Sequence, residues 1–214
     1  MSQRTWFQHL LDDNNAVELR VQDARDRWTS GIYDDLDALL RDMAHFNERG
    51  YNGYTSLNPP THYVVTNRVH RKVQALRNTD IEQYTRLLID LDPEREESPS
   101  SDDELDLARE AARRVHALMK GYGFPEPAWA CSGNGIHLIY RAKIPKAGDF
   151  YPQWKETLKG LSNLVQVEGV KLDASVGNPA RICRAYGTFN LKGAETSQRP
   201  FRQSEVLVPS RYRC

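Results

Sequence analysis

The sequence has few cysteines, no long apolar run and no excess of charge of either sign. Three cysteines, Cys131, Cys183 and Cys214, are scattered without a CxxC pair, which argues against a disulfide framework and a structural zinc site. The formal net charge is zero, so the composition does not indicate a globally basic nucleic-acid binder. The mean hydropathy is −0.68, and no stretch predicts a membrane span.

The N-terminus lacks the pattern of a secretory signal. Its first residues, MSQRTWFQHLLDDNN, do not combine a basic start with an apolar stretch, so a cytoplasmic location is expected. Hydrophobic residues make up 39% of the 214 positions, which predicts a packed globular core rather than disorder.

Strand and helix patterns alternate along the chain, as in an α/β or α+β fold. The segments AWACS and IHLIYRA flank GNG and predict a β-hairpin. Ser101 and Glu104 form the pattern of a helix capping box. The other strand patterns cover residues 16–22, 51–60, 84–92, 170–173 and 204–209, and the helix patterns cover 34–50, 101–123 and 149–166.

The segment LLIDLDP, residues 87–93, ends an apolar run with two aspartates, Asp90 and Asp92. Side chains two apart on a strand point to one face, about 6–7 Å apart, so these carboxylates repel each other there. A hard divalent cation such as Mg²⁺ or Mn²⁺ relieves that repulsion, whereas a strand that ends in solvent needs no ligand. The pattern alone leaves both interpretations open.

The segment SGNGIHLIYR places glycines at the mouth of the predicted hairpin. Backbone N–H groups of such a turn can form an anion-binding nest, although a plain tight turn has the same composition. His137 follows on the next strand, where either a ligand contact or a satisfied core histidine fits the pattern.

The segment VKLDASVGNPARICRAYGTFNLKG supplies a third carboxylate, Asp173, and then three cations, Arg181, Arg184 and Lys192. Cations in a stretch rich in Gly, Asn and Pro are typical of phosphate binding, and also of an ordinary surface loop. Charge is unevenly spread, since residues 90–110 hold ten acids and two bases, and residues 181–214 hold seven Lys/Arg and two Glu. This asymmetry fits either solvated surfaces or a metal-loaded acidic centre beside a phosphate-binding edge.

Together and in this order, the three segments resemble the archaeo-eukaryotic primase superfamily. The DxD after an apolar strand, the SGxGxH motif, and the hydrophobic-Asp pair before NPARICRAYGTFNLKG match the motifs of that family. The likeness is strongest to the primase–polymerase domains of phages, plasmids and CRISPR-linked loci. It extends to ELRVQD, SGIYDDLDALLRDM and GYNGYTSLNP, and covers roughly residues 16–205.

The resemblance implies an α/β (α+β) fold, namely a two-module primase–polymerase core with an RRM-like catalytic sheet and an active-site cleft between the modules. It implies a single catalytic domain over residues 1–214, with an N-terminal module of about 1–80 and a catalytic module of about 81–214. Neither a helicase nor a zinc domain is expected, because no GxxxxGK[ST] motif occurs and the cysteines supply no zinc ligands.

The activity implied is template-dependent nucleotidyl transfer by a two-metal mechanism, as in a DNA primase and/or DNA polymerase. Asp90, Asp92 and Asp173 are the expected catalytic residues and ligands of two Mg²⁺ or Mn²⁺ ions. The residues expected to bind the nucleotide and its triphosphate are Ser132, Gly133, Asn134, Gly135, His137, Arg184 and Lys192, with Asn58, Arg68 and Arg181 as further candidates.

The implied partners are a DNA template and primer and dNTPs and/or NTPs, and not a membrane. A separate helicase, or other replication or CRISPR proteins, is also compatible with the resemblance. Two alternatives stay open: a replication-initiator-type nuclease and a catalytically silent nucleic-acid-binding module. The nuclease uses paired histidines and a tyrosine nucleophile, but GIHLIY holds one His and His116 lies alone on a predicted helix. A DxD glycosyltransferase leaves SGNGIH without a role.

Overall fold

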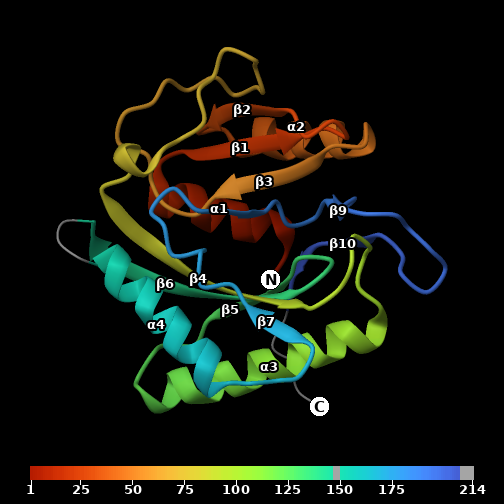
Figure 1. The fold of residues 1–214 in the computed structure, drawn as a ribbon. Coiled ribbons are helices and arrows are strands. Elements are labelled where there is room, and N and C mark those ends of the chain that lie inside the picture. The colour runs from red at the N-terminus through yellow and green to blue at the C-terminus, as the bar shows by residue number, and fades with distance from the viewer. Residues whose placement is uncertain (147–149, 208–214) are drawn as a thin grey trace.

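The computed structural model describes residues 1–146 and 150–207. These residues form a mixed α+β fold with two main antiparallel sheets, as expected (Figure 1). The four α-helices of the described residues are α1 (Gln3–Asn14), α2 (Leu36–Glu48), α3 (Asp102–Gly121) and α4 (Phe150–Leu164). None of them is long and apolar enough to cross a membrane.

The first sheet has the strand order β2-β1-β3-β8. Its strands are β1 (Val17–Gln22), β2 (Trp28–Tyr33), β3 (Asn52–Ser56) and β8 (Ile182–Arg184). Strand β8 pairs with β3 although Cys183 follows its partner Thr55 by 128 positions. A strand that follows residue 81 therefore completes the first sheet, and the two modules expected from the sequence stay a prediction.

The second sheet has the strand order β11-β5-β6-β4-β7. Its strands are β4 (Gln83–Pro93), β5 (Ala128–Cys131), β6 (Ile136–Pro145), β7 (Val170–Leu172) and β11 (Glu205–Val206). Along the chain, β4, α3, β5, β6, α4 and β7 make the β-α-β-β-α-β order of an RRM-like unit. A short pair, β9 (Phe189–Asn190) and β10 (Arg202–Gln203), and a 3₁₀ turn, η1 (Asn78–Asp80), complete the structure.

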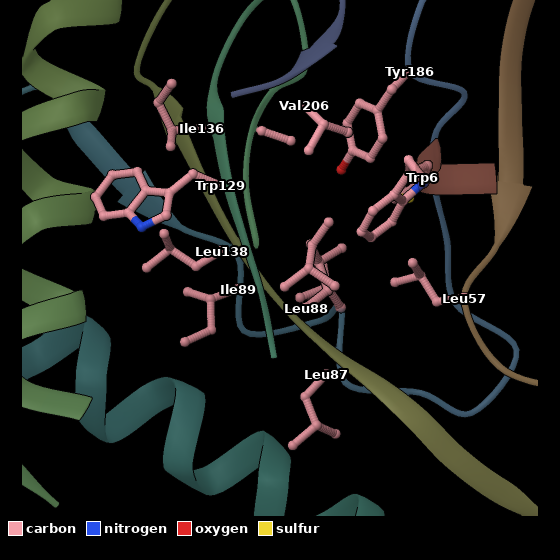
Figure 2. Close-up of a cluster of buried hydrophobic side chains, with 14 of the residues drawn as sticks. Trp6, Leu57, Leu87, Leu88, Ile89, Trp129, Ile136, Leu138, Tyr186 and Val206 are labelled. Carbon is pink, nitrogen blue, oxygen red and sulfur yellow. The ribbon is translucent and has the colours of Figure 1, made fainter. Parts of the chain in front are cut away.

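The hydrophobic core lies on both faces of the second sheet. Helices α3 and α4 cover one face, and α1 packs on the other, against β1 and β11 (Figure 1). The alternation along β4 divides its side chains, because Ile89 points toward the helices whereas Leu88 lies with Trp6 and Tyr186 on the opposite side (Figure 2). Leu88, Asp90 and Asp92 consequently share the face that is turned away from α3 and α4.

Most predicted elements are present, with small differences at their ends. The hairpin forms between β5 and β6, and the Ser101–Glu104 capping box begins α3. The sequence patterns did not single out α1, where Gln8 and His9 separate two apolar pairs, or β2, where Thr29, Ser30 and Gly31 separate Trp28 from Ile32. The predicted helix at 149–166 begins, and the predicted strand at 204–209 ends, outside the described residues. Cys214 also lies outside them.

Candidate functional site

A cleft of about 410 Å³ opens between the two sheets. The first sheet contributes Trp28, Tyr54 and the β8 residues to its lining, and the second sheet contributes Leu88, Asp90, Asp92 and His137. The remaining lining residues come from the connecting segments and β9, and are Arg95, Ser132, Asn134, Asp173, Val176, Arg181, Asn190 and Lys192. The cleft therefore gathers residues from all three motifs of the sequence.

The two aspartates of the DxD motif line the cleft from β4. Antiparallel pairing of β4 with β6 places His137 directly opposite Asp90, and its Nε2 lies 3.2 Å from Asp90 Oδ1. Gly135 accommodates Asp92 closely, because a Cβ atom at Gly135 would lie 2.2 Å from Asp92 Oδ1. The hairpin thus fixes both carboxylates from the side of β6.

Burial and mutual repulsion divide the acidity of the two carboxyls. Burial, and after it the neighbouring charge of Asp90, raise the pKa of Asp92 to about 6. Burial also raises the pKa of Asp90, but His137, Arg181 and Lys192 outweigh it and hold that pKa below its usual value. Asp90 is therefore the carboxyl that ionises first, and Asp92 bears the cost of a second buried charge.

Asp173 reaches the same cleft from the end of β7. Its backbone N–H donates to the carbonyl of Asp90 at 3.0 Å, so the strand pairing carries the third carboxylate back beside the first. One carboxylate oxygen, Oδ1, accepts the N–H of Ser175 at 2.7 Å. Within residues 1–146 and 150–207, no three Asp, Glu, His or Cys side chains form a ready metal cluster, so Asp90, Asp92 and Asp173 converge only as neighbours.

His137 is a buried residue with both ring nitrogens engaged. Its Nδ1 lies 2.6 Å from the hydroxyl of Tyr186, whose side chain is fully buried. A tyrosine hydroxyl that donates to Nδ1 leaves the proton on Nε2, which then faces Asp90. Contact between His137 and a triphosphate, as the resemblance implies, requires Nε2 to exchange Asp90 for a phosphate oxygen.

The Gly-rich turn uses its own polar groups to hold its shape. The Ser132 hydroxyl accepts the backbone N–H groups of Asn134 and Gly135, at 3.3 and 2.9 Å. Gly133 has φ of +92°, which favours glycine. The Nδ2 group of Asn134 is buried at the cleft without a hydrogen-bond partner in the described structure, so it is the donor of this turn that a ligand can use.

A cationic and aromatic wall faces the carboxylates. The Arg184 guanidinium lies over the ring of Tyr54, 4.5 Å from its centre, and Lys192 Nζ lies 5.5 Å from the same centre. Burial lowers the pKa of Arg184, yet a guanidinium stays protonated in proteins. Its bonds go to neutral groups, Asn52 at 3.0 Å and the Tyr54 hydroxyl at 3.4 Å.

Arg181 lies nearer to the carboxylates than its sequence position suggested. It lines the cleft, one amino group donates to the Ser175 carbonyl at 2.7 Å, and its buried Nε has no partner in the described part of the chain. The sequence analysis did not select Trp28, Tyr54 or Arg95, which also line the cleft. Tyr54 lies in GYNGYTSLNP, where it was the one aromatic residue of the predicted strand apart from Tyr51 at its start.

Two candidates lie away from the cleft lining. The Asn58 side chain is buried and bridges the backbone, donating to Pro179 O and accepting from the amides of Thr85 and Arg86. Arg68 is exposed in the segment between β3 and β4, whose backbone follows the edge of β2. Gly133 and Gly135 of the turn are not in the lining either, so four residues of the set selected from the sequence do not line the cleft.

The donor set fits a hard divalent cation in part. Asp90 Oδ1 is buried, and its contact with His137 Nε2 at 3.2 Å lacks the geometry of a good hydrogen bond; the charge of Asp90 also raises the pKa of Asp92. Oxygen donors of this kind suit Mg²⁺ or Mn²⁺. Asp90 and Asp92 are therefore the side chains suited to hold a cation, with Asp173 adjacent to them.

No protein-family model matches the sequence, and no curated protein matches it. Solved structures do match the fold. The polymerase domain of Mycobacterium tuberculosis Ligase D, in complex with DNA, has a TM-score of 0.54 at 13% identity, covering 94% of this chain and 78% of that one. Primase RepB′ has a TM-score of 0.53 at 11% identity.

The match to RepB′ covers 96% of this chain but only 56% of that one, so the chain spans just over half of the RepB′ length. The catalytic domain of RepB′, in complex with initiator DNA, matches with a TM-score of 0.50 at 11% identity, covering 94% and 82%. At these identities the likeness is one of fold. The chain therefore has the fold of these polymerase and primase domains, as the sequence predicted.

Proposed function

We propose that this chain is a template-dependent nucleotidyltransferase, a DNA primase and/or DNA polymerase that joins dNTPs or NTPs to a strand paired with a template. One observation carries the proposal. The cleft has buried carboxylates on one wall and cations on the other, yet within the described residues no ion pair joins Asp90, Asp92 or Asp173 to a Lys or Arg. A nucleotide accompanied by a divalent cation carries both of the missing counter-charges.

The chain's own residues divide the work according to their positions. Arg184 and Lys192 bind the triphosphate oxygens, and Tyr54 beneath them holds the two cations in place. The Asn134 Nδ2 group donates to a phosphate oxygen. Trp28 is half exposed at the rim and offers a ring face for a base.

Asp90 and Asp92, with Asp173 beside them, are the residues that hold the divalent cations. Divalent cations held there would supply electrostatic stabilisation of the attacking and leaving oxygens of nucleotidyl transfer. His137 keeps Asp90 oriented through its Nε2. Gly135 of the hairpin lies so close to Asp92 that no larger residue fits at its position. Two ions remain the expectation for this site.

The nuclease alternative needs an accessible tyrosine. Tyr186, the tyrosine beside His137, is fully buried, so its hydroxyl cannot reach a DNA phosphate in this conformation. No second histidine lines the cleft within the described residues. The structure thus gives the nuclease no supporting observation.

The test is an incubation of the protein with primed and unprimed templates, labelled nucleotides and Mn²⁺ or Mg²⁺. We expect products longer than the primer, or new short strands on the unprimed template, and none with EDTA or with Asp90→Asn. Cleaved template without extension would support the nuclease. Binding without either product would support the silent module.

A further inference from the structure

Residues 57–79, most of the segment between β3 and β4, are basic and largely exposed, and Asp80 and Glu82 follow them before β4 begins. Residues 57–79 contain no acidic residue and four Lys/Arg, namely Arg68, Arg71, Lys72 and Arg77. Arg68, Arg71 and Lys72 are exposed, and the described structure gives them no ion pair. Exposed cations without carboxylate partners leave a local positive potential for an anionic partner.

The other basic segment of the chain differs in this respect. Arg199 binds both carboxylate oxygens of Glu104, at 2.7 and 2.8 Å. Arg202 pairs with Asp102 at 2.7 Å. These cations are neutralised by the acidic start of α3, whereas Arg68, Arg71 and Lys72 of the β3–β4 segment have no ion pair in the described structure.

The segment is held against the first sheet rather than extending freely. His70 donates its backbone N–H to Ser30 of β2 at 2.9 Å. Gly31 permits a still closer approach, because a Cβ atom there would lie 2.3 Å from the Arg68 carbonyl. Leu76 is buried in a small cluster with Ile32 and fixes the far end. The cations are therefore presented from a fixed backbone.

The middle and the C-terminal end of the segment lie near residues that line the cleft. His70 pairs with Ser30, two residues from Trp28, which lines the cleft and is 47% exposed. At the C-terminal end, Asn78 accepts the amide of Ala180 at 3.1 Å, next to Arg181 of the cleft. Figure 1 shows the segment arching over the first sheet beyond β2. A chain leaving the cleft past Trp28 therefore meets this segment first.

We propose that residues 62–77 bind the sugar–phosphate backbone of a single-stranded nucleic acid that continues from the cleft at Trp28. Arg68, Arg71 and Lys72 contact its phosphates, and the exposed ring of Tyr63 stacks on its bases. This inference rests on the proposed function only for naming the strand, which is the template.

The test compares two triple variants with the same change in net charge. Arg68→Gln, Arg71→Gln and Lys72→Gln alter the segment. Arg109→Gln, Arg113→Gln and Arg114→Gln alter α3, which covers the opposite face of the second sheet. Fluorescence anisotropy of a labelled single strand of about 20 nucleotides measures affinity across a range of salt concentrations.

We expect the slope of log affinity against log salt to be about −2 to −4 for the unaltered protein and to lose about 2 in the segment variant, since each single-strand phosphate contact contributes about 0.7. At 0.1 M salt this is a loss of about 100-fold. The α3 variant keeps the original slope. Equal slopes in all three proteins would overturn the inference.

Two further measurements separate this inference from the proposed function. Nucleotide binding in the cleft is measured without DNA, and extension is measured at saturating DNA. If the protein extends no primer but the segment variant binds the strand more weakly, only the proposed function is contradicted. If the protein extends primers and the segment variant binds the strand as tightly as the unaltered protein, only this inference is contradicted. Loss of binding to phosphatidylserine vesicles, with no strand binding by any variant, would assign the segment to a membrane and overturn the inference.

Discussion

The wall of the cleft formed by the second sheet differs from the wall formed by the first sheet in both charge and origin. The acidic wall is assembled from neighbouring strands, with Asp90 and Asp92 on β4 and Asp173 hydrogen-bonded beside them. The cationic wall depends on β8, which returns to β3 from a distant part of the sequence and carries Arg184. The two walls do not neutralise each other by ion pairs among the described residues.

This difference explains how the carboxylates of one wall and the cations of the other remain available to bind a ligand. A buried carboxylate repelled by its neighbour and a buried guanidinium bonded to neutral groups are both costly without a ligand. The folded chain accepts both costs at one place, which is typical of functional sites. Removing the charge from each wall in turn tests whether the two walls act on the same ligand.

The largest effect is expected when the acidic wall loses a charge. Asp90→Asn and Asp92→Asn keep the side-chain volume, and each should lower the single-turnover extension rate by about 10³-fold or more, because residues that act as one unit fail together. The double variant should lose little more than either single one. Losses that multiply would contradict a shared cation site. Asp173→Asn with an unaltered rate would show that the third motif is misassigned.

The next effect is expected from the cationic wall. Arg184→Gln removes the charge over Tyr54 and should weaken nucleotide binding by about 10- to 100-fold, the size of a lost charge-assisted hydrogen bond. Tyr54→Phe is the matched control, since it removes the hydroxyl that Arg184 contacts but keeps the ring. Equilibrium binding of a labelled nucleotide measures both. A lower melting temperature with unchanged affinity would assign Arg184 to stability.

A smaller effect is expected from the hydroxyl behind His137. Tyr186→Phe keeps the ring that packs edge-on against Trp6 and removes the contact to His137 Nδ1. We expect kcat to fall about 5- to 10-fold, the size of one lost hydrogen bond, with little change in the nucleotide KM. The ¹⁵N spectrum of His137 should show a changed tautomer population. An unchanged spectrum, with reduced stability only, would make Tyr186 a packing residue.

His137→Ala separates the two roles left open for the histidine. Loss of a triphosphate contact raises the nucleotide KM, whereas loss of the Asp90 partner lowers kcat. A variant that only melts earlier, with normal activity per folded molecule, would show that His137 is a satisfied core residue. Steady-state kinetics at several nucleotide concentrations distinguish the three results.

Parts of this site were predictable because they depend on local periodicity. The two-residue spacing of Asp90 and Asp92 and the hairpin signal around GNG specify which face and which neighbour each residue has. The pairing of Arg199 with Glu104 was not predictable, because it joins residues about 95 positions apart. Phosphate binding by Arg181, Arg184 and Lys192 therefore stays a prediction. Arg199, from the same basic stretch, already pairs with Glu104.

Some residues of the correct type serve other purposes. Asn58 was selected from SLNP, but its amide satisfies buried backbone groups between β3 and β4. To predict this role, one must know which backbone groups lack hydrogen-bond partners in the sheets, and a single sequence does not give that information. Tyr54 and Trp28 were missed because an exposed aromatic residue on a strand has the same pattern as one packed on the surface.

The smallest expected effect concerns stability and pH in the metal-free protein. The pKa of Asp92 is about 6 in the folded chain and 3.8 by its ordinary value. Between these values the folded chain retains a proton that the unfolded chain has released, so the stabilising contribution is complete below about pH 4 and is lost as the pH rises through 6. Asp92→Asn removes this loss. With EDTA at pH 7 its melting temperature should exceed that of the unaltered protein by a few degrees, and the difference should disappear at pH 4.

The exposed Asp12→Asn is the control for removing a charge of the same size. If Asp92→Asn and the unaltered protein show the same dependence on pH, burial beside Asp90 does not penalise the second charge. The repulsion on which the acidic wall's affinity for a cation is argued would then be absent.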